Sequence, residues 1–152
     1  PTPIYVFVAV CILAAITLKL TPFGRAIYAV GSNEEAAHLS GINVPLVTFG
    51  VYIIGGILAA LSGLIFLSRL SVGDPNSGLG LELEAITIAV IGGTSLFGGE
   101  GSVIGTIGGA MILAIIANVL NLAGVSPFSQ QVVKGAIIIL AVLLEAGRKP
   151  RK

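Results

Sequence analysis

Few side chains in this sequence are suited to catalysis or metal binding, and they lie far apart. The chain has one histidine, His38, and one cysteine, Cys11. Covalent catalysis needs a nucleophile beside a base, and a metal centre needs several clustered ligands. Neither residue has such a neighbour in the sequence. We therefore expect no catalytic residue, no metal site and no enzymatic activity in this chain.

Amide side chains form a second group of candidates. Asn118 and Asn121 lie three residues apart within an apolar run, so a helix would place them on one face. Gln130 and Gln131 follow near the start of the next apolar run. Uncharged amides donate and accept hydrogen bonds, which suits a hydroxyl-rich solute such as a sugar. Asn118 and Asn121 can also bond neighbouring helices, and Gln130 and Gln131 can simply face water, so a solute path and these alternatives remain open.

Charged residues are rare inside the apolar runs. Lys134 lies well inside one, which makes it a functional candidate, although it is near enough to the helix start to reach the membrane surface. Every carboxylate lies near an expected edge, loop or break, which argues against an ion-coupled secondary transporter. The glycines of residues 92–101 lack a following Gly-Lys-Ser/Thr, so they predict no phosphate-binding loop.

The composition indicates that much of the chain is buried in a lipid bilayer. Of 152 residues, 55% are hydrophobic and 10% charged, and the mean hydropathy is +1.06, whereas soluble proteins carry about 25% charged residues. This places the chain in the membrane class. The net charge of +1 gives no indication of a nucleic-acid partner, and none is expected. Because the sequence begins at Pro1 within an apolar run, we expect the C-terminal part of a longer membrane protein.

The apolar runs predict an all-α fold, a polytopic transmembrane helix bundle with about five membrane segments that forms the C-terminal part of a single transmembrane domain. The expected spans are residues 3–19, 44–67, 84–99, 102–123 and 127–146. The 84–99 segment is short and ends in two glycine pairs, so we expect it to be broken or re-entrant. Residues 74–78 are predicted to form a turn.

Lysine and arginine are concentrated in the loop of residues 20–43 and its edge, and in the tail of residues 148–152. Between residues 68 and 84, Arg69 stands among acidic residues. The positive-inside rule therefore predicts that the 20–43 loop and the C-terminus are cytoplasmic, and that residues 68–84 lie outside.

A short polar helix is predicted within VGSNEEAAHLSGINVP, residues 30–45. Ser32 followed by Glu35 reads as a capping box, with Ser32 as the N-cap, and Gly41 suits the left-handed position after the helix. So short a helix is marginal alone. It must pack either on a partner protein or on its own flanking helices.

Two stripes of small residues predict close helix packing, either static or able to slide. They are Gly101, Gly105 and Gly109 with Gly108 beside them, and Gly56, Ala60 and Gly63.

Three stretches carry a family resemblance: TPFGRAIYAVGSNEEAAHLSGINV (21–44), ELEAITIAVIGGTSLFGGEGSVIGTIGGA (82–110) and NVLNLAGVSPFSQQVVKGAIIILAVLLE (118–145). In this order they resemble permease subunits of ABC-type sugar importers of the ribose-transport type. The same superfamily includes permeases for branched-chain amino acids. Glu100 and Glu145 depart from the common pattern, which leaves the roles of those two positions open.

The resemblance implies a multi-pass permease in the inner membrane of a prokaryote that moves a ribose-like monosaccharide. The alternative is a permease for branched-chain amino acids or another small polar solute. The implied partners are a second permease copy, a cytoplasmic ATP-binding subunit that holds ATP and Mg, and a periplasmic or extracellular sugar-binding protein. The chain itself would hold no cofactor. The polar helix would couple to the ATPase, and the residues matched to this role are Asn33, Glu34, Glu35, Ala36, Ala37 and Gly41, with Arg25 steadying the loop.

Overall fold

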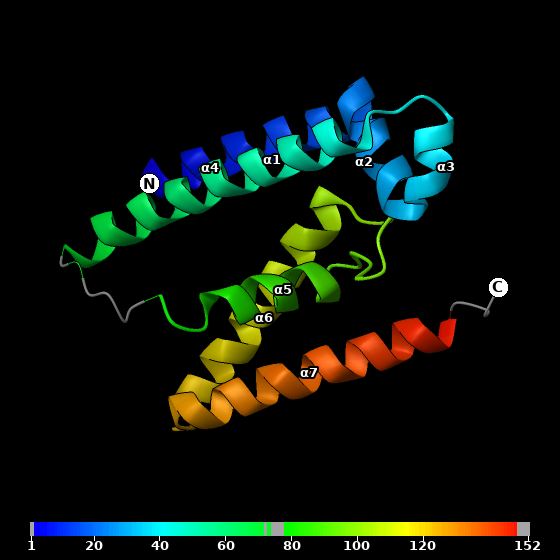
Figure 1. The fold of residues 1–152 in the computed structure, drawn as a ribbon. Helices are drawn as coiled ribbons and strands as arrows, with labels where there is room; N and C mark the ends of the chain where they lie inside the picture. Colours follow the sequence, from blue (N-terminus) through cyan, green and yellow to red (C-terminus); the bar gives the residue numbers. More distant parts are fainter. Residues whose placement is uncertain (1, 72, 74–77, 149–152) are drawn as a thin grey trace. The chain divides into compact units, whose positions relative to one another are not determined.

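The structure is a computed structural model that describes residues 2–71, 73 and 78–148. The described residues form seven α-helices, and no strand occurs among them (Figure 1). They divide into two compact units, residues 1–77 and 78–152. The prediction of an all-α fold is confirmed. Residues 74–77 of the expected turn, and residues 149–152 of the basic tail, lie outside the described residues.

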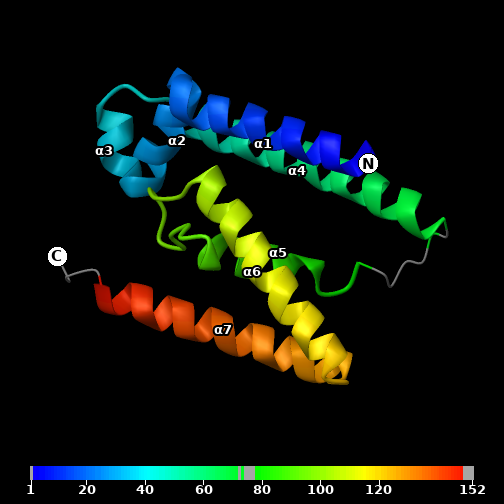
Figure 2. The same cartoon turned by 180° about the vertical axis from the view of Figure 1, so that it is seen from behind.

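The first unit contains two long apolar helices joined by two short ones. Its helices are α1 (Thr2–Leu20), α2 (Pro22–Ser32), α3 (Glu34–Leu39) and α4 (Val44–Leu70). Figure 2 shows α2 and α3 together where α1 ends and α4 begins. Helix α2 contacts α1, α3 and α4. It is therefore the hub on which the other three helices of this unit converge.

Helix α2 lies inside the 20–43 loop, where the sequence analysis predicted no second helix. Its start has clear local causes: the Thr21 hydroxyl accepts the Gly24 N–H at 3.1 Å, and Pro22 occupies the first turn. Gly24 is buried, and a side chain there would overlap the backbone carbonyls of Thr17 and Leu18. The Thr-Pro pair was the signal that could have found this helix.

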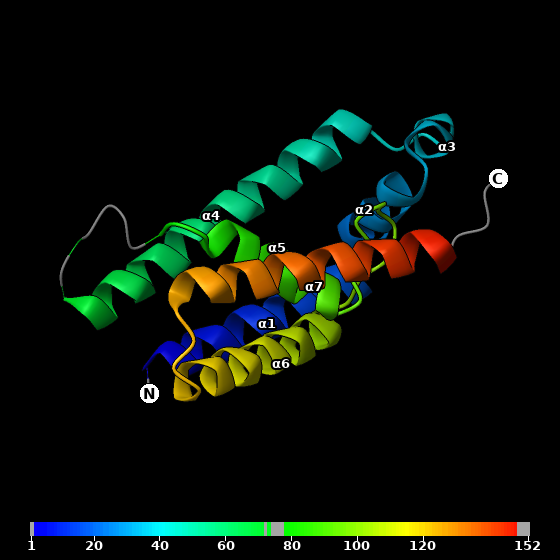
Figure 3. The same cartoon turned by 90° about the horizontal axis from the view of Figure 1, so that it is seen from below.

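The second unit contains three helices, α5 (Leu81–Ile91), α6 (Val103–Leu122) and α7 (Pro127–Arg148). Helix α5 contacts both α6 and α7, and Figure 3 shows the chain reversing direction between α6 and α7. Helix α7 is capped at its start, because the Ser126 hydroxyl accepts the Ser129 N–H at 3.3 Å just before Pro127.

Helix α5 is the short, broken segment. Its helix begins at Leu81 and ends at Ile91, so it starts before the expected 84–99 segment and ends well before residue 99. Gly93 has φ +83° and the Thr94 N–H donates to the Ala89 carbonyl at 2.9 Å, which closes the helix. The 11 residues of α5 span only about 16 Å, about half of a ~30 Å hydrocarbon core.

Four helices of the described residues are long and apolar enough to cross a membrane: Thr2–Leu20, Val44–Leu70, Val103–Leu122 and Pro127–Leu144. They match four of the five expected spans. Few large side chains are buried within the chain, the most enclosed being Leu113 at 2% exposure. Most apolar side chains of these helices point outward, as expected of helices that meet lipid or further helices.

Candidate functional site

The tightest contact in the second unit joins α5 to α6 through three glycines, Gly92, Gly105 and Gly109, which we call the glycine seam. A Cβ atom on Gly92 would lie 2.6 Å from the Gly105 carbonyl oxygen, and one on Gly109 would lie 2.8 Å from the Gly92 nitrogen and overlap the Ile88 carbonyl. Backbone therefore meets backbone, which is the use of small residues predicted for Gly105 and Gly109.

The other predicted small residues are placed differently. A Cβ atom on Gly101 would meet the Thr94 side chain at 3.1 Å, whereas Gly108 has open space around it. The stripe on α4 is also open, because no other described residue lies within 4 Å of a Cβ on Gly56 or Gly63, and Ala60 is exposed. Packing of the α4 stripe stays a prediction.

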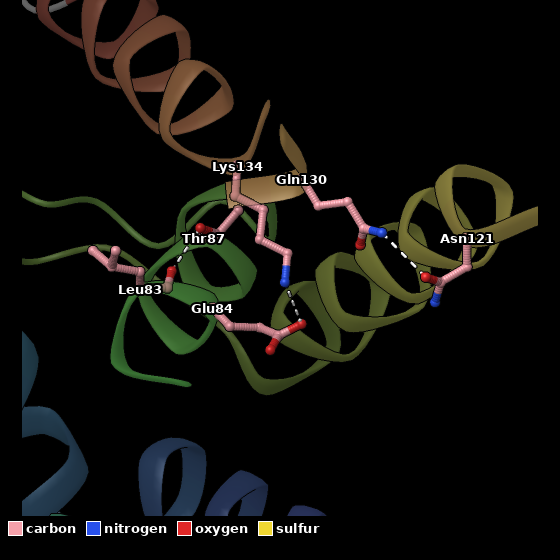
Figure 4. Close-up of polar contacts among 6 residues, drawn as sticks. All are labelled: Leu83, Glu84, Thr87, Asn121, Gln130 and Lys134. Carbon is pink, nitrogen blue, oxygen red and sulfur yellow. Dashed lines mark hydrogen bonds and ion pairs between the residues drawn. The ribbon is translucent and has the colours of Figure 1, made fainter. Parts of the chain in front are cut away.

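Helix α7 is joined to α5 by an ion pair. The Lys134 ammonium donates to the Glu84 carboxylate at 3.0 Å (Figure 4). The two side chains are 22% and 32% exposed. Beside them Thr87 is fully buried, with its hydroxyl donating to the Leu83 carbonyl at 2.6 Å. The sequence left Lys134 open as a functional charge or as one that reaches the membrane surface. It did not indicate Glu84 as the partner.

The predicted amides are brought together only in part. The Gln130 amide nitrogen donates to the Asn121 side-chain oxygen and to the Val125 carbonyl, both at 3.1 Å. The bond to Asn121 joins α7 to the end of α6, which is the helix-to-helix alternative for Asn121, and the bond to Val125 reaches the connection between the two helices. The Gln131 amide lies beside Gly80 at the start of α5, 3.5 Å from where a Cβ would stand, and Asn118 is exposed. A solute path along these amides stays a prediction.

The polar helix is α3, and its cap differs from the predicted one. Ser32 is the last residue of α2, and Asn33 is the N-cap of α3, with its side-chain oxygen accepting the Ala36 N–H at 2.9 Å. The prediction of Ser32 as the cap was wrong, because helix α2 continues through Ser32 and leaves the next residue extended. Glu34 and Glu35 occupy the first turn, where the helix dipole favours negative charge.

The end of α3 is as predicted. Gly41 has φ +85°, and the Ile42 N–H donates back to the Ala37 carbonyl at 3.1 Å, which is the Schellman arrangement. Asn43 then caps α4 by accepting the Leu46 N–H at 3.2 Å. The chain thus changes helix direction twice within a few residues, with both turns fixed by local hydrogen bonds.

The residues assigned to α3 face two ways. Ala37 is 4% exposed and packs within the first unit. Asn33, Glu34, Glu35 and Ala36 are exposed, as are Arg25 on α2 and Gly41. Leu39 is 81% exposed, so α3 presents one large apolar side chain together with two carboxylates. The coupling role of this surface stays a prediction.

The described residues contain no group of three or more His, Cys, Asp or Glu that could hold a metal ion. The structure is that of a multi-pass helical membrane protein. It has four long apolar helices, the short helix α5 packed against α6 and α7, and the short polar helix α3 at one end of the first unit.

The family follows from comparison with known sequences. A family model described as "Branched-chain amino acid transport system / permease component" matches residues 2–142. The chain belongs to this permease family.

Sugar permeases are among the curated proteins that this chain resembles. The chain is 48% identical over 145 residues to the ribose import permease protein of Escherichia coli (strain K12), covering 95% of this chain and 45% of that protein. It is 47% identical to the ribose import permease protein of Bacillus subtilis (strain 168), with the same coverage. It is 46% identical over 151 residues to the xylose transport system permease protein of Escherichia coli (strain K12), covering 99% of this chain and 38% of that protein. The chain thus spans less than half the length of these relatives. No solved structure matches it.

Proposed function

We propose that this chain belongs to the permease subunit of an ATP-driven importer that moves a monosaccharide across the inner membrane of a prokaryote. The observation that carries the proposal is the 48% identity over 95% of the chain to a ribose import permease. The xylose permease is nearly as similar, so the proposed substrate class is a pentose-like sugar rather than one named sugar. The family description keeps a branched-chain amino acid as the alternative solute.

The other subunits of the importer would be separate chains. The ATP and Mg would be held by an ATPase on a partner chain, as the similarity to import permeases supports. A second permease copy would complete the path, and an extracytoplasmic binding protein would deliver the sugar. The open small-residue face of α4 at Gly56 and Gly63 offers room for close helix contact in such an assembly. The C-terminus would be cytoplasmic.

Helix α3 would couple the permease to the ATPase. Its support is an exposed surface of two carboxylates and Leu39 on a helix held firmly at both ends by Asn33 and Gly41. Because Ala37 is buried, it would help to pack α3 in place rather than contact the ATPase. A rigid helix that contacts α2 and α4 can pass a displacement of the ATPase on to both.

The experiment that tests the function measures ATP hydrolysis by the full-length permease and its ATPase in proteoliposomes. The binding protein is added loaded with ribose, xylose, another monosaccharide or a branched-chain amino acid. We expect a pentose-loaded binding protein to stimulate hydrolysis severalfold. Stimulation by an amino acid alone would replace the sugar with the alternative solute, and no stimulation by any solute would refute the importer proposal.

The coupling role predicts a charge-sensitive interface. In the full-length permease, replacing Glu34→Lys together with Glu35→Lys should reduce copurification of the ATPase by tenfold or more in order of magnitude, because two carboxylates that face the partner become cations. Membrane insertion should not change. The control is Glu82→Lys, an exposed carboxylate in the first turn of α5. Normal copurification of the α3 variant, or equal loss in the control, would contradict the coupling role.

A further inference from the structure

The two ends of α5 are fastened by different kinds of contact. At its C-terminal end, the glycine seam brings the backbone at Ile88 and Gly92 directly against α6. Backbone-to-backbone packing has no flexible side chain to rotate away, so this end is fixed. The N-terminal end lacks a side-chain cap, and Gly80 before it has φ +89°.

Among the described residues, the side chain of Lys134 on α7 makes a polar contact with this N-terminal end, and a second α7 side chain lies near it. Gln131 lies beside Gly80, and Lys134 reaches Glu84 at 3.0 Å. Residues 131 and 134 share one face of α7, so α7 lies alongside the first turn of α5. An ion pair between long side chains, 22% and 32% exposed, can open by rotation about side-chain bonds without breaking any backbone hydrogen bond of either helix.

Gln130 makes a second contact of α7 that does not involve the ion pair. Its amide nitrogen bonds the Asn121 side chain at the end of α6 and the Val125 carbonyl in the connection that follows α6. The α6–α7 connection therefore has a side-chain contact that does not involve Lys134 (Figure 4). Loss of the ion pair would remove the one charged contact between α5 and α7 among the described residues and leave that α6–α7 contact in place.

We propose that Lys134 is a positioning residue whose ion pair with Glu84 is a releasable latch. When the pair is closed, the N-terminal end of α5 is held against α7. When it opens, α5 pivots about the glycine seam. The inference deepens the proposed function, since a half-length helix that swings at one end is a means of opening and closing a solute path during the transport cycle. The apolar surroundings favour the closed pair, because an unpaired charge there is costly.

The test measures how quickly a cysteine at the start of α5 reacts with a maleimide. The full-length permease, with native cysteines including Cys11 replaced, carries Leu81→Cys or, as a control at the end of α6, Leu122→Cys. Leu81 is 44% and Leu122 82% exposed. The permease is placed in nanodiscs with its ATPase, so that both faces meet the reagent. Labelling is followed without nucleotide and after trapping with ATP and vanadate.

Without nucleotide, Lys134→Met should raise the labelling rate of Leu81→Cys about fivefold, the size expected when one pairwise contact is lost. The rate at Leu122→Cys should stay unchanged. Exchanging the charges, Glu84→Lys with Lys134→Glu, should restore most of the slow rate. In the wild-type background, trapping should also change the rate at Leu81→Cys, and Lys134→Met should remove that change.

Four results would overturn the latch. Two concern Lys134→Met: an unchanged labelling rate of Leu81→Cys, or an equal rise in the rate at Leu122→Cys. The other two are a charge exchange that does not restore the slow rate, and trapping that leaves the wild-type rate at Leu81→Cys unchanged. An equal rise at both cysteines would mark Lys134 as a general stabiliser of the fold. The nucleotide-free measurement needs no solute and no hydrolysis. Failure of the latch is therefore distinguishable from failure of the importer proposal, which appears as unstimulated ATP hydrolysis.

Discussion

Replacing Gly109 by alanine is expected to lower the free energy of unfolding of the full-length permease by about 3 kcal/mol or more, the upper range for overpacking of a close contact. In the structure, a Cβ atom at Gly109 would lie 2.8 Å from the Gly92 nitrogen and overlap the Ile88 carbonyl. Both are backbone groups, so α5 and α6 would have to separate. The measurement is the thermal unfolding midpoint of the purified protein, together with its monodisperse yield.

Gly108 provides the matched control for Gly109. The two glycines are neighbours in α6, but a Cβ atom at Gly108 meets nothing within 4 Å in the chain. Because alanine is about 1 kcal/mol better than glycine inside a helix, Gly108→Ala should leave the unfolding midpoint unchanged or raise it. The glycine seam requires that Gly109, and not Gly108, faces α5. Equal destabilisation by the two substitutions would contradict this orientation of α6.

The second large effect is expected at Gly24, in the first turn of α2. A Cβ atom there would lie 2.6 Å from the Leu18 carbonyl carbon and overlap the carbonyl oxygens at the end of α1. Gly24→Ala should therefore destabilise the protein by about 1–3 kcal/mol and tilt α2. Since α3 contacts α2, the substitution should also weaken copurification with the ATPase.

Unfolding midpoints of Gly24→Ala and Gly55→Ala check this prediction. Gly55 lies in α4 of the same unit and has nothing within 4 Å of its Cβ position, so its substitution should be neutral or stabilising. A Gly24→Ala protein with an unchanged midpoint and normal ATPase binding would show that the sharp junction of α1 and α2 does not depend on this glycine.

The elements that sequence alone predicted best are those set by local chemistry. Long apolar runs with few charges can only be helices in a membrane, and four spans were placed to within a few residues. The Gly41 end of the short polar helix was also correct, because a cap is satisfied within one turn of its own helix. Helix α2 could have been found in the same way from Thr21-Pro22, and its omission was a missed signal.

The cap of α3 shows where local chemistry becomes ambiguous. Ser32 and Asn33 are both good N-caps, and the sequence pattern favoured Ser32 through its capping box with Glu35. The choice was decided by the preceding helix, because α2 extends through Ser32 and only Asn33 is free to adopt an extended backbone. A neighbouring element, rather than the residue itself, selected the cap.

The sequence by itself determined a multi-pass helical membrane protein of a recognisable permease family, since composition, run length and capping are readable along the chain. Only the tertiary structure decided which side chains meet. Glu84 and Lys134 are 50 residues apart in sequence, and the difference between Gly108 and Gly109 depends on the side of α6 that α5 covers. Such contacts depend on the rotation of packed helices about their axes, which no local pattern in one helix specifies.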